Sequence, residues 1–214
     1  MTSLKKNVLI IGGTSGLGYS IYRDLSTENK NDVFIIGKSN RNNLSKENFL
    51  SIDISTEDFM DKVKKNYINI SHFDLIIHCA SPYGEDKVPN AKEMHDFYRV
   101  NVFSFWQLVT HFIENKMLIE NSIVISVGST AALKQVDYFN PAYVLAKNSL
   151  MQSSDIFQER FFTLGIKFCH IVLGSLGQDL VLHSDIMKYI HFLNSVSNGC
   201  FPTRIILKSK TEFS

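Results

Sequence analysis

The sequence has few of the features that mark secreted, membrane-spanning or disulfide-rich proteins. It contains 3 cysteines among 214 residues, an odd number at wide separations, which gives no indication of a disulfide framework. Its longest apolar runs fall short of the ~18 residues that a membrane-spanning helix needs. Glycines interrupt the first apolar run too early for a signal peptide. We therefore expect a cytoplasmic protein with no membrane partner.

An excess of charge of one sign is also lacking. The 22 Lys and Arg residues nearly balance the 21 Asp and Glu residues. No basic stripe is present, so no nucleic-acid partner is predicted. None of the 7 histidines forms an H-x-x-x-H pair or stands beside a cysteine pair at the spacing of metal ligands. No metal site is predicted, and we expect His78 and Cys79 to pack in the core or to line a pocket.

Short apolar runs alternate with helix-like stretches along the chain. Most of these runs are continuous, which is typical of parallel strands buried on both faces. The predicted strands are 7–11, 32–37, 49–53, 73–80, 122–128, 166–173 and 203–207. The predicted helices are 17–29, 56–67, 90–119, 141–164 and a weaker one near 180–194. This alternation predicts an α/β fold, a doubly wound, Rossmann-like parallel sheet of about seven strands with helices on both faces.

The first predicted strand runs into a glycine-rich turn, "IIGGTSGLG", over residues 10–18. In such a turn the backbone approaches a pyrophosphate closely, and the following helix offers free N–H groups. However, three residues separate Gly12 from Gly16, which differs from the commonest dinucleotide fingerprint. Glycine also serves any tight turn. On this stretch alone, a phosphate cradle and a simple turn both remain open.

The segment after the second predicted strand indicates which dinucleotide would bind. An NAD-binding sheet is expected to have Asp or Glu about 20 residues after the glycines. Here "IIGKSNRN" has Lys38 and Arg41 and no carboxylate. A cation at this point suits a 2′-phosphate and favours NADP(H) over NAD(H), although a solvated lysine is the alternative. Asp53 is a candidate to bond the adenine amino group, or to cap a helix that begins near Thr56.

The most informative stretch is "NPAYVLAKNSL", in which Tyr143 and Lys147 are four residues apart on a predicted helix. They therefore share one face of that helix. A free tyrosine has a pKa of about 10, and a neighbouring ammonium lowers it by favouring the phenolate. The two residues then form a plausible proton donor and acceptor. The alternative interpretation is a solvated surface pair.

Hydroxyl and amide side chains precede this pair in the chain. Ser129 and Thr130 lie just beyond the fifth predicted strand, 14 and 13 residues before Tyr143. A hydroxyl there is placed to hold a substrate carbonyl while Tyr143 protonates it. Asn101 lies inside a predicted helix between apolar residues, where a polar amide usually needs a partner. It either bonds a neighbouring backbone group or orders a water that leads to Lys147.

These elements, in this order, resemble the short-chain dehydrogenase/reductase family, and the resemblance covers about residues 7–174. It implies that Tyr143 is the acid–base and that Lys147 lowers its pKa and binds the nicotinamide ribose. It also implies that Ser129 positions the substrate and that Asn101 maintains a proton-relay water. The cofactor-binding residues implied by the resemblance are Gly12, Thr14, Ser15, Gly16, Leu17, Gly18, Lys38, Asp53, Ala80, Tyr143, Lys147 and Gly174.

The sequence also departs from the family pattern. "HCAS" over 78–81 replaces the usual Asn-Asn-Ala-Gly, Leu173 replaces a proline, and Gln178 replaces a threonine that contacts the carboxamide. Aligning "VGST" by its own pattern selects Ser129 as the catalytic hydroxyl, whereas counting back from Tyr143 selects Thr130. Choosing Ser129 leaves one extra residue in the loop before Tyr143. We prefer Ser129, because a one-residue loop insertion is a small change.

The sequence therefore predicts an NADP(H)-dependent oxidoreductase that moves hydride between nicotinamide and a carbonyl or alcohol substrate. We expect one domain over 1–214, with a short substrate-lid region at about 174–200. The helices near 90–119 and 141–164 are expected to form a homodimer or homotetramer.

Two other functions are considered. Because the motif after the sixth strand is altered, a catalytically weak or inactive NADP(H)-binding sensor or scaffold is the main alternative. A sugar-nucleotide epimerase shares the Tyr–Lys pair but usually needs a larger C-terminal domain.

Overall fold

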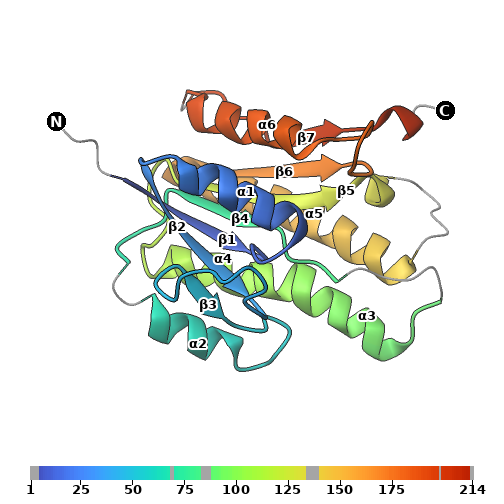
Figure 1. Ribbon diagram of the computed structural model, residues 1–214, viewed down its shortest axis with the longest axis horizontal. Helices are drawn as coiled ribbons and strands as arrows, with labels where there is room; N and C mark the ends of the chain where they lie inside the picture. Colours follow the sequence, from blue (N-terminus) through green and yellow to red (C-terminus); the bar gives the residue numbers. More distant parts are fainter. Residues whose placement is uncertain (1–4, 68–69, 83–87, 134–139, 198, 213–214) are drawn as a thin grey trace.

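The structure, a computed structural model, describes residues 5–67, 70–82, 88–133, 140–197 and 199–212. Within these residues seven parallel strands form one sheet, in the order β3-β2-β1-β4-β5-β6-β7 (Figure 1). The strands are β1 (Lys6–Ile11), β2 (Asn31–Gly37), β3 (Phe49–Ser51), β4 (Leu75–His78), β5 (Ile123–Ser129), β6 (Lys167–Leu173) and β7 (Arg204–Leu207). Every predicted strand is confirmed, with small shifts at the ends.

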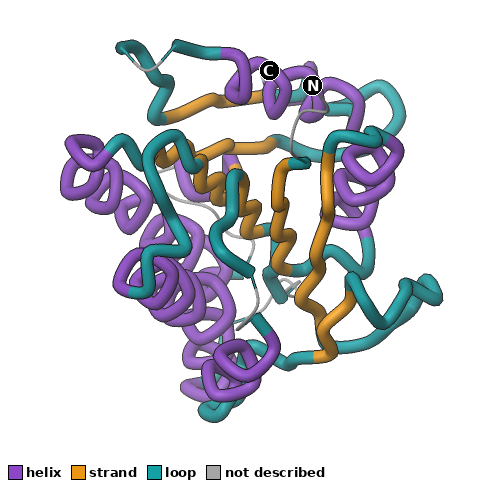
Figure 2. Tube along the Cα trace, turned by 90° about the vertical axis from the view of Figure 1, so that its left-hand side faces the viewer, coloured by secondary structure: helices purple, strands orange, loops and turns teal. Residues whose placement is uncertain are grey.

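Helices connect the strands and cover both faces of the sheet, as Figure 2 shows. They are α1 (Gly16–Thr27), α2 (Phe59–Asn66), α3 (Ala91–Tyr98), α4 (Ser104–Glu114), α5 (Pro141–Phe161) and α6 (His183–Ser195). Residues of α2, α4 and α5 belong to one buried cluster, and residues of α1 and α6 belong to another on the opposite face. The predicted doubly wound α/β architecture is confirmed.

The predicted helix over 90–119 is confirmed only in part, because it contains a π-helical turn and ends at Glu114. The structure has α3, then a π-helical turn over Arg99–Phe103, then α4. Lys116 has a φ of 56°, a left-handed conformation that does not continue a right-handed helix. The Met117 N–H then donates to the Phe112 carbonyl at 2.7 Å. The last apolar residues of the predicted helix therefore fill the core from a loop.

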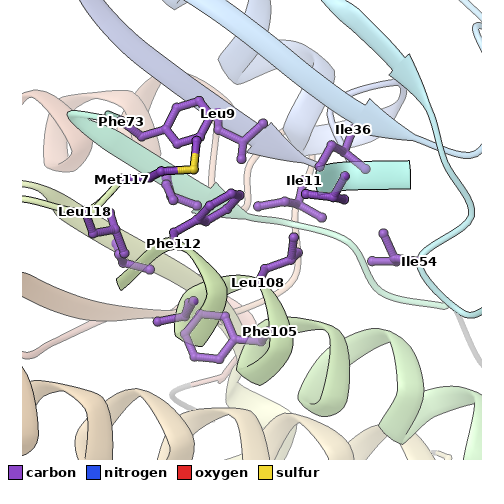
Figure 3. Packing of buried hydrophobic residues seen from close by; sticks show 14 of the residues in the cluster. Leu9, Ile11, Ile36, Ile54, Phe73, Phe105, Leu108, Phe112, Met117 and Leu118 are labelled. Atoms are coloured by element: carbon purple, nitrogen blue, oxygen red, sulfur yellow. The ribbon is translucent and has the colours of Figure 1, made fainter. Parts of the chain in front are cut away.

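The core on the α4 side is built from aromatic and branched side chains. Figure 3 shows Leu108 and Phe112 of α4 facing Leu9 and Ile11 of β1. Phe112 packs edge-on against Phe73, with 5.2 Å between ring centroids, a preferred aromatic geometry. The apolar face of α4 is therefore buried against the sheet, which fixes where the preceding π-helical turn lies.

The strand order determines where a ligand site is expected. β1 lies between β2 and β4, so the chain runs outward in opposite directions from the β1–β4 pair. In open parallel sheets, ligands bind at the carboxyl ends of the strands beside such a switch point. The loop after β1 is the glycine-rich turn, which therefore lies at the expected place.

Candidate active site

A cleft of ~830 Å³ opens at the carboxyl ends of the central strands. Its lining includes nine of the residues predicted to bind a dinucleotide: Gly12, Thr14, Ser15, Gly16, Leu17, Gly18, Lys38, Asp53 and Ala80. The structure thus brings together the turn after β1 and the loops after β2, β3 and β4. Tyr143, Lys147 and Gly174 were also predicted as cofactor-binding residues, but they do not line this cleft.

Two glycines make the close approach in this turn possible. Gly12 has a φ of +87°, and a Cβ there would lie 2.7 Å from the backbone of Ala80. A Cβ on Gly18 would lie 2.4 Å from the Gly12 carbonyl oxygen. Contacts this short force the structure to move, so both positions need glycine. The turn is therefore folded tightly onto the end of β4 and onto the start of its own helix.

The N-terminus of α1 faces the cleft, because Gly16, Leu17 and Gly18 all line it. The N-cap residue Ser15 makes no side-chain cap hydrogen bond, and the first turn contains no acidic residue. The unsatisfied N–H groups and the positive end of the helix dipole are therefore directed to this part of the cleft. Such an arrangement favours an anion.

Lys38 and Asp53 meet at the end of the cleft formed by β2 and β3. Lys38 Nζ lies 2.8 Å from Asp53 Oδ2, and the N–H and hydroxyl of Ser55 donate to Asp53 Oδ1 at 3.0 and 2.6 Å. Partial burial acts to raise the pKa of Asp53, but the hydrogen bonds from Lys38 and Ser55 and the Lys38 charge outweigh it and lower the pKa to about 2. Asp53 is thus an ionised partner of Lys38.

The alternative prediction, that Asp53 caps a helix beginning near Thr56, is wrong. α2 begins at Phe59 and has Asp58 as its N-cap residue. Asp53 instead closes a turn, because the Thr56 N–H and hydroxyl donate to the Asp53 carbonyl at 3.2 and 2.8 Å. Local side-chain bonds of this kind compete with helix formation, which explains the later start of α2.

The sequence did not predict three of the residues that line the cleft, Lys92 and Asp96 of α3 and Leu176 from the loop after β6. They come from parts of the chain distant from the glycine turn, and no local motif marks any of them. Outside this lining, Asn42 Nδ2 donates to the Thr14 carbonyl at 2.8 Å and ties the loop after β2 to the glycine turn.

Tyr143 and Lys147 lie on one face of α5, as their spacing predicted. Lys147 Nζ is 5.8 Å from the centroid of the Tyr143 ring, and Phe97 packs edge-on against that ring at 6.2 Å. The start of α5 is fixed by Asn140, whose side chain accepts the Tyr143 N–H at 3.2 Å, and by Pro141 in the first turn. Tyr143 is therefore held by contacts on both its backbone and its ring.

Lys147 is a buried cation, so the alternative of a solvated surface pair is wrong. Its relative exposure is 3%, and its Nζ donates to the Val127 carbonyl of β5 at 2.9 Å. Burial lowers the pKa of Lys147 to about 8 because a low-dielectric environment disfavours the charged form. The residue is still mostly protonated at neutral pH, and it is anchored beside the strand that ends in Ser129.

Asn101 lies in the π-helical turn between α3 and α4 and is fully buried. Its Nδ2 donates to the Phe97 carbonyl at 3.0 Å, as one of the two predicted alternatives requires. Its Oδ1 has no hydrogen-bond partner within the described residues. π-Helical turns occur often at functional sites, and a buried acceptor of this kind usually binds a water or a ligand.

The two candidate hydroxyls after β5 have different surroundings. Ser129 is the last residue of β5 and is half-buried, and its Oγ accepts the Ala131 N–H at 3.3 Å. Thr130 is buried, and its hydroxyl donates to the carboxylate of Glu212. The hydroxyl of Thr130 is therefore already bound to another part of the chain.

A row of polar side chains crosses the sheet beneath Lys147. His78, Ser126 and His170 are paired in register on β4, β5 and β6, so they share one face. Ser126 Oγ lies 2.7 Å from His170 Nδ1, and Ser104 Oγ lies 3.1 Å from His78 Nε2. Burial and the charge of Lys147 lower the pKa of both histidines to about 3. His78 is thus a buried core residue as expected, and Cys79 lines the cleft.

Comparison with known families agrees with this geometry. The sequence model of the family described as short chain dehydrogenase matches residues 6–183, which is most of the chain. The chain belongs to the short-chain dehydrogenase family. Comparison with curated proteins gives no significant match. The family assignment confirms the predicted resemblance at the level of an oxidoreductase family.

Solved structures of this family share the fold. A short-chain dehydrogenase from Streptomyces avermitilis has a TM-score of 0.85 at 15% identity, over 99% of this chain and 91% of that one. One from Leptospira borgpetersenii with bound NAD+ has a TM-score of 0.80 at 17% identity, over 96% and 92%. A Brucella ovis family member with a partially ordered NAD has a TM-score of 0.77 at 18% identity, over 95% and 100%. At these identities the likeness shows the fold alone.

No helix among the described residues of this short-chain dehydrogenase combines the length and apolar character that a membrane crossing requires. No group of three or more His, Cys, Asp and Glu side chains in the same ranges is placed to hold a metal ion.

Proposed function

We propose that this family member is an NADP(H)-dependent oxidoreductase that interconverts a carbonyl and a hydroxyl group, with Tyr143 as general acid and base. The observation that carries the proposal is the buried ammonium of Lys147, fixed by the Val127 carbonyl beside the Tyr143 ring. A buried cation without an anionic partner costs stability, so its retention beside a tyrosine favours a chemical role.

The chain's own residues supply the proton transfer and the orientation of the substrate. The Tyr143 hydroxyl gives its proton to the carbonyl oxygen, and the nearby Lys147 ammonium stabilises the resulting phenolate. The Ser129 hydroxyl holds the carbonyl oxygen in place. This choice over Thr130 is supported by the bond from Thr130 to Glu212. The buried Oδ1 of Asn101 would hold a water that returns a proton toward Lys147.

The cleft fits a dinucleotide. The Gly12–Gly18 contact and the N-terminus of α1 provide a cradle in which the pyrophosphate meets backbone N–H groups. Lys38 would bind the 2′-phosphate of NADP(H), and Asp53 would contact the adenine. When bound, the reduced nicotinamide supplies the hydride that reaches the carbonyl carbon. Two structural relatives hold NAD, so our proposal that this chain prefers NADP(H) rests on Lys38.

The Tyr143→Phe variant tests the acid. Wild-type protein is expected to oxidise NADPH with at least one member of a broad panel of ketones and aldehydes. The variant is expected to lose at least ~100-fold of that rate, because general acid catalysis contributes on this scale. Thermal stabilisation by NADPH should remain, which would separate binding from chemistry. Full activity of the variant would refute Tyr143 as the acid.

A second candidate is a cofactor-binding sensor or scaffold without useful turnover. It is favoured by one observation, namely that Ser129, Tyr143 and Lys147 do not line the cleft that gathers the other cofactor residues. Strong stabilisation by NADPH, with no turnover of the carbonyl panel or of a matching alcohol panel, would support this candidate instead.

Phe103 of the π-helical turn and Leu145 and Ile156 of α5 are exposed apolar side chains. They support our proposal of a homodimer or homotetramer that forms through this face. We propose one catalytic domain over 1–214 with the predicted lid region at about 174–200. Within that region the loop at 174–182 is the part proposed to cover the substrate, because α6 packs its apolar side into the core. The three cysteines are free thiols, which fits the reducing cytoplasm.

A further inference from the structure

The segment that follows β7 returns to the carboxyl end of the sheet, where Figure 1 draws it in red beyond the arrowheads. It ends in a 3-10 turn over Lys210–Glu212. Glu212 Oε2 accepts the N–H and the hydroxyl of Ser209 at 2.8 and 2.9 Å. Glu212 Oε1 accepts the hydroxyl of Thr130, the residue after Ser129. One carboxylate therefore joins the segment after β7 to the end of β5.

The end of β6 is shaped to admit this carboxylate. The Gly174 N–H donates to the Leu207 carbonyl at 2.7 Å. A Cβ on Gly174 would lie 1.8 Å from Glu212 Oε2 and 3.0 Å from the Ser209 nitrogen. Any side chain at this position would therefore displace the carboxylate. The glycine leaves the space that Glu212 occupies.

The carboxylate lies just beyond the last pairs of the sheet. The β5–β6 pairing ends at Ser129 and Leu173, and the β6–β7 pairing ends at Leu173 and Leu207. The backbone ladder therefore stops at Ser129. Beyond it, Glu212 connects Thr130 to Ser209, and both of these residues are buried. Hydrogen bonds from several donors to a carboxylate are stronger than those between neutral groups.

We propose that Glu212 is a positioning residue for the catalytic hydroxyl, and that it acts by holding Thr130 and the end of β5. This inference rests on the proposed function, in which Ser129 orients the substrate oxygen. Without the carboxylate, Thr130 and Ser209 lose a shared acceptor, and the turn after Ser129 loses its link to the segment after β7. That turn then keeps the bond from Asn148 Nδ2 of α5 to the Ala132 carbonyl at 3.2 Å. Glu212 is not expected to touch the substrate, since its two oxygens accept from Thr130 and Ser209.

The first test compares Glu212→Ala with Glu212→Gln and with the control Glu159→Ala, which changes an exposed glutamate of α5. Glu212→Ala is expected to lower kcat by roughly tenfold or more, because the buried hydroxyl groups of Thr130 and Ser209 lose their acceptor, with stabilisation by NADPH unchanged. Glu212→Gln keeps one acceptor oxygen and is expected to recover part of this loss. Unchanged kcat in Glu212→Ala would overturn the proposal.

Hydrogen exchange tests the same proposal without turnover. The amides of residues 129–131 are expected to exchange about tenfold faster in Glu212→Ala than in wild type or Glu159→Ala, because local opening becomes easier. Equal exchange rates would overturn the positioning role. If the wild-type protein shows no turnover at all, the proposed function fails, while the exchange result still decides whether Glu212 holds the end of β5.

A double-mutant cycle tests the contact with Gly174. Gly174→Ala is expected to lower Tm clearly in the wild-type background, because its methyl group collides with the carboxylate. In the Glu212→Ala background the same substitution is expected to cost much less, leaving only the closer approach to Ser209. Such non-additivity is the mark of residues in contact. Equal losses of Tm in both backgrounds would contradict the arrangement.

Discussion

Lys38 and Asp53 form an ion pair in the cleft, with Lys38 Nζ 2.8 Å from Asp53 Oδ2. The lysine that we assign to the 2′-phosphate is therefore already opposite a carboxylate. Lys38 is largely exposed, so the pair is easily exchanged for another partner. A bound 2′-phosphate and Asp53 would share the same ammonium, and the two negative charges would repel each other.

This relationship predicts opposite effects of two substitutions on cofactor preference. Lys38→Ala is expected to weaken NADPH binding while leaving NADH binding almost unchanged. Asp53→Asn is expected to increase the affinity for NADPH relative to that for NADH by roughly two- to fivefold, which is the size of an exposed charge interaction. The measurement is the Tm increase with each cofactor, with Lys46→Ala as a control at an exposed lysine. Equal or better stabilisation of the wild type by NADH would refute the role of Lys38.

The burial of Lys147 predicts that its removal stabilises the protein. The pKa of Lys147 is about 8 in the folded state and 10.5 ordinarily. Folding therefore costs free energy at every pH at which Lys147 of the unfolded chain is protonated. That cost is full below pH 8, on the order of 3 kcal/mol. It decreases as the pH rises from 8 toward 10.5.

Lys147→Met is therefore expected to raise the free energy of unfolding at pH 7 and to abolish turnover. The gain is expected to shrink at pH 9.5, because wild-type Lys147 is then largely neutral in the folded state. Urea unfolding at the two pH values measures it. A variant that is less stable than the wild type at pH 7 would show that the ammonium is paired more favourably than its contacts indicate.

The buried histidines predict a loss of stability in acid. The Ser104 hydroxyl donates to the Val100 carbonyl at 2.6 Å, so it accepts from His78 Nε2–H. A second proton on His78 would go to Nδ1, which has no partner among the described residues. Because its pKa falls from 6.5 to about 3, the unfolded state binds more protons between these values. Stability is therefore full above pH 6.5 and decreases as the pH falls.

As the pH falls from 6.5 to 5, each buried histidine should lower the free energy of unfolding by about 2 kcal/mol. His78→Gln and His170→Gln are each expected to remove one such contribution from the slope of stability against pH. His95→Gln, which changes an exposed histidine of α3, is expected to keep the wild-type slope. The measurement is denaturant unfolding at pH 5, 6 and 7. Identical slopes in all four proteins would show that neither buried histidine stays neutral in the fold.

Local pattern was sufficient for the strands and for the residues that follow them. Continuous apolar runs such as 122–128 are typical of parallel strands that are buried on both faces. The four-residue spacing of Tyr143 and Lys147 placed both residues on one helical face. The glycine turn was recognisable from its own sequence, although only the Gly18 contact with Gly12 is local and the Gly12 contact is with Ala80, beyond the end of β4.

Features that depend on distant contacts were not predictable in this way. The π-helical turn around Asn101 is invisible in an amphipathic pattern, because one extra residue per turn changes the periodicity only locally. The burial of Lys147 depends on the Val127 carbonyl, and the contact of Glu212 with Thr130 spans 82 residues of sequence. No composition or spacing rule connects such positions.

The Gly12–Gly18 contact predicts the cost of a single methyl group in the glycine turn. Gly18→Ala would place a Cβ 2.4 Å from the Gly12 carbonyl oxygen, so the N-terminus of α1 has to move away from the turn. Overpacking of this kind costs about 1–3 kcal/mol of unfolding free energy. The matched control is Gly199→Ala, where an added Cβ meets nothing within 4 Å.

Gly18→Ala is also expected to lose most of the stabilisation by NADPH, since the displaced N–H groups of α1 would no longer face the pyrophosphate. Gly199→Ala is expected to match the wild type in both measurements, which are urea unfolding without cofactor and the Tm increase with NADPH. If Gly18→Ala kept the full NADPH effect while losing stability, the glycine would serve only the tight turn. The pyrophosphate cradle would then have to be sought elsewhere in the cleft.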